Sequence, residues 1–188
     1  NQFVTELPHK LKLEVSLFIH EYSYKRIHCF RGRSSAFISY VCPLLRPRPF
    51  PENQYVFFEG DDVTSIYFLI KGKCGFVLPK YKNTAYIEIP HGSHFGIIDI
   101  VGSILKTQYE LDNWFTHKDQ LQRQFTVMAM CKCDTMLLSI SDLYRMKQEF
   151  LEAYEKLFND SYSRLRRALT LKLKAMKICQ DVEDDIKS

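Results

Sequence analysis

The sequence predicts an α+β fold in which an antiparallel β-roll of the jelly-roll type lies between N-terminal helices and a long C-terminal helix. Aromatic residues make up 14% of the 188 residues, a share that favours a β-rich core. Short runs of β-branched and aromatic residues alternate with turn residues between about 50 and 140. On both sides of this region, apolar residues recur at the three- and four-residue spacing of a helix.

The N-terminal region, residues 5–45, is expected to be helical. Thr5 is a candidate N-cap for a first helix. The apolar face of this helix would consist of Leu11, Val15, Phe18, Ile19 and Tyr22. Ser34 or Ser35 can cap a second helix, which Pro43 and the proline-rich run 46–49 are expected to end. The apolar residues of this second helix are Phe37, Ile38, Val41 and Leu44.

The central region has the pattern of a series of short strands separated by turns. The expected strands are 54–58, 65–70, 76–81, 85–89, 124–130 and 135–140. The expected turns are 59–62, 71–72 and 82–83, where Gly, Asp and Asn gather. Residues 91–96 are expected to form a loop.

The C-terminal region, residues 141–178, is predicted to be helical, with Ser141 as the N-cap and Asp142 favourable to the helix dipole. One face is apolar, and the opposite face has a row of Arg and Lys residues. The remaining residues, 181–188, form a polar tail that is expected to fray.

Composition excludes several classes of function. The net charge of +4 is too small to indicate a nucleic-acid partner, although it suits an anionic ligand. No apolar run reaches the roughly 18 to 20 residues of a membrane span, and the first residues lack the apolar core of a signal peptide. We expect the chain to be a fragment of a longer protein, since it opens without Met. No nucleophile elbow, Walker loop or zinc-hydrolase motif is present, so we expect no enzyme.

Metal binding is a minor alternative. The six cysteines are scattered, and buried reduced thiols explain them better than a disulfide or a metal site does. Cys131 and Cys133 share one face of a strand if the segment is extended. His91 and His94 have a possible ligand spacing, but two loop histidines without a third partner are usually structural.

Several motifs follow one another in an order that resembles the signature of cyclic nucleotide-binding domains. They are Glu59-Gly60-Asp61, Tyr67-Phe68-Leu69-Ile70-Lys71-Gly72, Gly92-Ser93-His94-Phe95-Gly96 and Arg123-Gln124-Phe125-Thr126-Val127. Glu6-Leu7-Pro8 and Leu44-Leu45-Arg46-Pro47 are similar to the linker and first helix of cyclic nucleotide-regulated cation channels. This group includes hyperpolarisation-activated, cyclic nucleotide-gated and ether-à-go-go-type potassium channels. The resemblance covers nearly the whole chain.

The resemblance implies a set of ligand-binding residues. Arg123 stands where the family's phosphate-binding arginine lies, and a guanidinium can hold two phosphate oxygens. Gly96 would let the backbone approach the ligand, and a short helix over 97–101 would favour the phosphate. Arg164 falls where channel relatives cap the base from the final helix. Phe76, Ile87 and Ile89 match apolar positions that line the base pocket. The remaining implied site residues are Phe95, Ile97, Asp99 and Gln124.

Two departures from the family pattern weaken the expectation of binding. Ile97 replaces the glutamate that accepts a hydrogen bond from the ribose, a loss of roughly 1 to 3 kcal/mol. Asp99 lies nearby as a possible substitute. An insertion over about 103–121, with Trp114 as the only Trp, would either plug the pocket or contact a neighbouring subunit.

We therefore interpret the chain as the cytoplasmic regulatory domain of a membrane cation channel, with potassium as the expected ion. Residues 1–32 would be linker helices and residues 33–180 the binding domain. cAMP or cGMP would be the ligand rather than a bound cofactor, and closure of the final helix would act on the pore domain of the same chain in a homotetramer. Two alternatives stay open, a ligand-independent homology domain of such a channel and a regulatory subunit of a cyclic nucleotide-dependent kinase.

Overall fold

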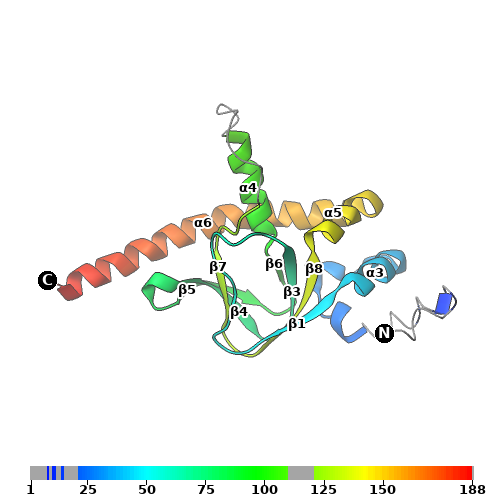
Figure 1. Cartoon of the computed structure of the whole chain (residues 1–188), viewed down its shortest axis with the longest axis horizontal. Coiled ribbons are helices and arrows are strands. Elements are labelled where there is room, and N and C mark those ends of the chain that lie inside the picture. The colour runs from blue at the N-terminus through cyan, green and yellow to red at the C-terminus, as the bar shows by residue number, and fades with distance from the viewer. Residues whose placement is uncertain (1–7, 9, 12–13, 15–20, 110–120, 188) are drawn as a thin grey trace.

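The computed structural model describes residues 8, 10–11, 14, 21–109 and 121–187. It confirms the predicted α+β class, because the described residues form two four-stranded antiparallel sheets and a long C-terminal helix (Figure 1). The predicted first helix lies largely outside the described residues, including Thr5, Val15, Phe18 and Ile19. Leu11 and Tyr22, which are described, are exposed.

The elements are named as in Figure 1. Those before the roll are the 3-10 turn η1 (His28–Phe30), helix α3 (Ser35–Val41) and the 3-10 turn η2 (Cys42–Leu44). The strands are β1 (Arg46–Phe50), β2 (Tyr55–Phe57), β3 (Ser65–Lys71), β4 (Lys73–Leu78), β5 (Thr84–Pro90), β6 (His94–Phe95), β7 (Thr126–Ala129) and β8 (Cys133–Ser139). The remaining elements are η3 (Pro79–Tyr81), α4 (Ile97–Tyr109), α5 (Ile140–Glu149) and α6 (Leu151–Lys187).

The two sheets face each other across an apolar core. One has the strand order β1-β8-β3-β6 and the other β2-β7-β4-β5, so strands distant in sequence lie side by side. Burial on both faces explains the continuous apolar run of β3, in which every residue except Lys71 is buried. The largest fully buried side chains of the strands and of the segment before β7 are Phe50, Ile66, Phe68, Leu69, Phe125 and Leu138.

Helix α3 begins where its serine cap was expected. The Ser34 hydroxyl accepts a hydrogen bond from the amide of Phe37, so Ser34 rather than Ser35 is the cap. Phe37 packs edge-on against Phe150 at the α5–α6 junction, with ring centroids 5.4 Å apart. This contact joins the N-terminal segment to the C-terminal helices.

The proline-rich run 46–49 is a strand, and the expectation that it only ends a helix was incomplete. Strand β1 pairs with β8, with Arg46 opposite Leu137 and Phe50 opposite Cys133. It lies at the edge of its sheet. Prolines are tolerated there because alternate amides of an edge strand face away from its single neighbour. The roll therefore begins at Arg46 rather than near residue 50.

Other boundaries also differ from the predictions. Strand β6 pairs with β3 inside the predicted loop 91–96, and residues 79–81 form a 3-10 turn instead of ending a strand. Helix α4 runs to Tyr109, well past the expected 97–101 and into the segment taken as an insertion. Trp114 and the rest of residues 110–120 lie outside the described residues.

The C-terminal helical region consists of two helices. Ser139, not Ser141, caps α5, because its hydroxyl accepts from the amide of Asp142. Helix α6 then runs along the roll and continues beyond it to Lys187, through the tail expected to fray (Figure 1). Its buried residues are Ala153, Leu157, Phe158, Ser161, Leu165 and Ala168. These side chains hold the first half of α6 against the rest of the domain.

Candidate functional site

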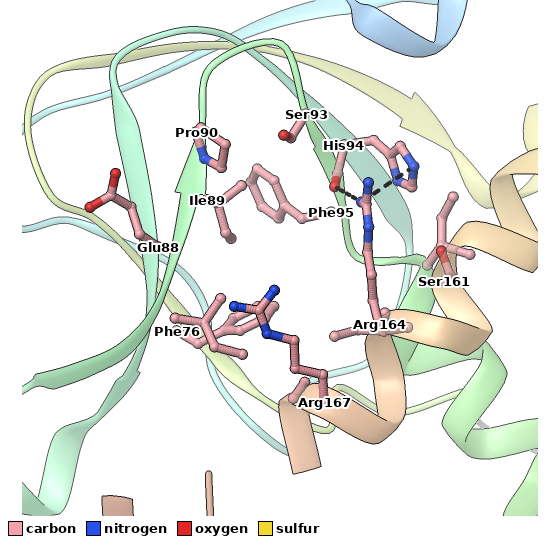
Figure 2. Close-up of a pocket in the computed structure, with 14 residues that line it drawn as sticks. Phe76, Glu88, Ile89, Pro90, Ser93, His94, Phe95, Ser161, Arg164 and Arg167 are labelled. Carbon is pink, nitrogen blue, oxygen red and sulfur yellow. Dashed lines mark hydrogen bonds between the residues drawn. The ribbon is translucent and has the colours of Figure 1, made fainter. Parts of the chain in front are cut away.

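A pocket of about 280 Å³ lies between the β4–β5 hairpin, the segment leading through β6 into α4, and helix α6. Figure 2 shows its two sides, with side chains of the strands facing two arginines from the helix. Its lining residues are Phe76, Ile87, Glu88, Ile89, Pro90, Ser93, His94, Phe95, Ile97, Ile98, Ser161, Arg164, Arg167 and Ala168.

The wall formed by the roll is largely apolar. Five residues predicted to belong to the binding site line it, namely Phe76, Ile87, Ile89, Phe95 and Ile97. These five residues stand on four elements, β4, β5, β6 and α4. Ile97 is only 1% exposed, so the residue in place of the family glutamate is a packed part of the wall. An apolar surface of this kind suits a flat apolar group such as a nucleobase.

The wall formed by α6 is cationic. Arg164, the sixth predicted site residue that lines the pocket, donates from Nη1 to the backbone oxygen of His94 at 3.3 Å, and this Nη1 lies 3.5 Å from the His94 Nε2 (Figure 2). Arg167 also lines the pocket and extends from α6 toward the roll. Arg167 was not among the predicted site residues, because it belongs to the row of Arg and Lys residues on the face opposite the apolar one. Its spacing of three residues from Arg164 was the available signal, since such residues share a helix face.

His94 lies buried beside Arg164, with 5% of its surface exposed. Burial, reinforced by the positive charge of Arg164, lowers the pKa of His94 to about 3. The imidazole is therefore neutral at physiological pH. Its Nδ1 is buried without a hydrogen-bond partner among the described residues.

Arg123 does not line this pocket but lies buried inside the roll, 3% exposed. Its Nη2 donates to the backbone oxygen of Ser65 at 2.6 Å, and its Nη1 donates to the oxygen of Gly96 at 3.2 Å. The guanidinium also lies over the ring of Phe57, 3.9 Å from the ring centroid. Arg123, which the resemblance assigns to phosphate binding, thus holds its guanidinium against the backbone of Ser65 and Gly96 and the ring of Phe57.

Asp99, in the first turn of α4, is the charged partner of Arg123. Its Oδ2 accepts from Arg123 Nη1 at 3.0 Å, and its Oδ1 accepts from the amide of Gln124 at 2.6 Å. Burial raises the pKa of the Asp99 carboxyl, and the Arg123 guanidinium and the Gln124 amide oppose that shift. The structure therefore brings together Gly96, Asp99, Arg123 and Gln124, but in a buried cluster apart from the pocket lining.

The cysteines are free thiols, and Cys74 lies with its Sγ 3.8 Å from the Sγ of Cys133 between the two sheets. Burial raises the pKa of both thiols. His91 and His94 have no third partner, because no group of three potential metal ligands gathers among the described residues. None of the described helices is long and apolar enough to cross a membrane.

Comparison with known proteins shows sequence similarity to ion channels. The chain is 25% identical over 156 residues to human "Cyclic nucleotide-gated channel alpha-3", covering 83% of this chain and 21% of the relative. It is 24% identical over the same length to the chicken "Cyclic nucleotide-gated channel cone photoreceptor subunit alpha", covering 83% of this chain and 20% of that relative. Bovine "Cyclic nucleotide-gated channel alpha-2" is 27% identical over 100 residues, covering 53% of this chain. No family model matches the chain.

The chain spans about a fifth of the length of the first two relatives. The architecture and the sequence similarity agree with the order of motifs in the chain. The chain is a sequence relative of cyclic nucleotide-gated channels, and its two antiparallel sheets with a long C-terminal helix are consistent with a cyclic nucleotide-binding jelly roll.

Proposed function

We propose that this chain is the cytoplasmic regulatory domain of a cation channel, with potassium as the expected ion, and that it binds a cyclic nucleotide between the roll and α6. The observation that supports this proposal is the pocket, in which an apolar wall faces two arginines. A cyclic nucleotide combines a flat base with one negative charge. The base suits Phe76 and Ile89, and the charge suits the positive side of the pocket.

Helix α6 is the element that would report ligand binding. Arg164 and Arg167 belong to the pocket only while α6 lies against the roll, because the helix positions both guanidinium groups. A ligand that contacts the roll and these arginines together has a higher affinity for the docked helix than for the undocked one. This difference in affinity is the free energy that would shift the population toward the docked state.

The structure provides contacts through which a shift of α6 could reach the N-terminal segment. Phe150, which precedes α6, packs against Phe37 and Tyr40 of α3 with ring centroids 5.4 and 5.3 Å apart. Arg33 lies 3.4 Å from the carboxylate of Glu152 in the first turn of α6. On the other side of the pocket, the amide of His28 donates to the oxygen of Gly92 at 2.9 Å. We propose that residues 1–32 link these contacts to the pore domain of the same chain in a homotetramer.

Calorimetric titration tests this proposal, comparing wild type with Arg164→Gln for cAMP and cGMP. Arg164→Gln should weaken binding about five- to tenfold, since it removes a partly solvated charge from the pocket. Arg166→Gln is the matched control, because Arg166 stands on the same helix, is exposed and does not line the pocket. Absence of binding to wild type at millimolar nucleotide would end the proposal, and equal effects of the two variants would remove Arg164 from the site.

A ligand-independent homology domain is the second candidate function. Two observations favour it, namely that Arg123 already has the charged partner Asp99 and that Ile97 is packed where a ribose-binding carboxylate is expected. In that case α6 would hold its position through protein contacts alone, and the domain would serve as a fixed coupling element. The kinase-subunit alternative has no support from the relatives described above, which are channels.

A further inference from the structure

The buried cluster around Arg123 contains a complete set of anion-binding groups. Three of the guanidinium contacts are to oxygens of the chain, and its Nε is buried without a partner among the described residues. Only 2% of the Arg123 side chain and 1% of the Asp99 side chain are exposed. An ion pair this well buried is screened little by water or salt, and a second anion reaches the guanidinium only by displacing the first.

The Asp99 carboxylate accepts hydrogen bonds from the groups that would bind a phosphate ester. One carboxylate oxygen accepts from the Arg123 guanidinium, and the other accepts from the backbone amide of Gln124. The carboxylate also lies in the first turn of α4, where the helix dipole favours negative charge. A guanidinium, a backbone amide and a helix N-terminus are the donors expected for a phosphate, and here they converge on a side chain of the same chain.

Gly96 shows how closely this arrangement is packed. Its φ is +101°, and a Cβ at this position would lie 2.8 Å from Arg123 Nη1. The space next to the bare backbone, which the resemblance assigns to a ligand, is therefore filled by the guanidinium. Arg123 is directed inward, toward Asp99 and Ser65, and not into the pocket beside α6.

We propose that Asp99 is an internal counter-anion that sets the anion affinity of the domain by competing with a ligand phosphate for Arg123. This inference rests on the proposed function, because it concerns the phosphate of the ligand proposed to bind beside α6, although Arg123 itself does not line that pocket. A ligand phosphate must exchange with the carboxylate, so wild type binds anions weakly at this position. Loss of the Asp99 charge removes the anion that pairs with Arg123. A phosphate from solution can then take the place of the Asp99 carboxylate.

The variant Asp99→Asn tests the proposal, with cAMP and inorganic phosphate as probes. We expect its melting temperature to be lower than that of wild type, and to rise with either probe by several degrees more than that of wild type. Its affinity for cAMP should be at least tenfold higher. The double variant Asp99→Asn/Arg123→Gln should lose this anion dependence, because the Arg123 guanidinium is removed. Asp142→Asn is the matched control, since Asp142 also stands in the first turn of a helix, in a partly exposed pair with Arg145.

Different outcomes separate this inference from the proposed function. If wild type binds cAMP and Asp99→Asn binds it no more tightly, the inference fails and the proposed function stands. If only Asp99→Asn binds, the inference holds and the wild-type domain is the ligand-independent one. If Asp99→Asn does not fold in sodium chloride, recovery of the fold in sodium phosphate at equal ionic strength supports the inference, and failure in both salts contradicts it. Equal rescue of the double variant would also contradict it.

Discussion

Lys172 fixes the middle of α6 to the roll, and its replacement offers a direct test of the docked helix. Its Nζ donates to the Glu59 carboxylate at 2.6 Å and to the backbone oxygen of Gln124 at 3.1 Å. The ammonium also lies 5.4 Å from the ring centroid of Phe125. Only 17% of the Lys172 side chain is exposed, although 56% of Glu59 is. The contact therefore joins α6 to both the β2–β3 turn and the segment before β7.

The substitution Lys172→Met removes the charge and retains most of the stem. A hydrogen bond to a charged group contributes about 1.5 to 3 kcal/mol, and an exposed ion pair contributes up to about 1 kcal/mol. Because Glu59 is more than half exposed, we expect a loss near the lower end, about 1 to 2 kcal/mol. A loss of 1.4 kcal/mol is a tenfold change in an equilibrium constant. The ratio of docked to undocked α6 should therefore fall about tenfold, and any nucleotide affinity that depends on docking should fall by no more than this factor.

Hydrogen exchange of the α6 amides and urea denaturation measure these effects. Peptides around Lys172 should exchange faster in Lys172→Met than in wild type at low salt, and the difference should narrow at high salt. Lys174→Met is the matched control, since Lys174 stands on the same helix and is exposed. If the two variants exchange at the same rate and have equal free energies of unfolding, the Lys172 contacts do not hold the helix and the reasoning is wrong.

Two further predictions concern the residues beside the pocket. The pKa of His94 is about 3 in the folded domain and near 6.5 in the unfolded chain. As pH falls, the unfolded state therefore binds the proton first, and the free energy of unfolding declines as pH falls through about 6.5 toward 3. Between pH 7.5 and 5.5, the His94 contribution should lower the free energy of unfolding by about 1 kcal/mol, and His94→Gln should lack this part of the decline in urea titrations at the two pH values. Gly96→Ala should destabilise the domain by about 2 kcal/mol or more, because it combines a strained φ of +101° with a Cβ 2.8 Å from Arg123 Nη1. Gly60→Ala is its control, since Gly60 has a φ of +90° and open space around it, and equal losses in the two variants would show that crowding of Arg123 is unimportant.

Local sequence was sufficient for elements whose signals are independent of distant residues. The run from Ser65 to Ile70 became β3 because an apolar, β-branched and aromatic stretch bounded by turns has few other stable conformations. Ser34 became the cap of α3 because its hydroxyl is three residues from the amide that it accepts from. Phe95 of the pocket wall stands in one of the quoted motifs, whereas Phe76, Ile87 and Ile89 were predicted as positions that the resemblance implies.

Elements that depend on a distant partner were placed less well. Arg46–Phe50 has two prolines and little intrinsic preference for a strand, yet it pairs with β8, more than 80 residues later. Strand β6 is only two residues long and exists through its pairing with β3. Pairing of this kind is tertiary information, because the backbone donors of one segment are satisfied by another that local pattern does not identify.

The sequence by itself determined the type of domain, the order of its elements and the types of residue around the pocket. Motifs and apolar periodicity depend on residues that are close together in the chain, so they can be recognised without the tertiary structure. Only the tertiary structure decided where the charges go. Arg123 and Asp99 are 24 residues apart in the sequence. From the sequence, Arg123 was predicted to bind a phosphate, and Asp99 was a possible substitute for the glutamate that Ile97 replaces. The fold places both in the same buried space, where two opposite charges without water must pair. The fold also places Arg167 at the pocket. The buried side chains of α6 determine which face of this helix lies against the roll.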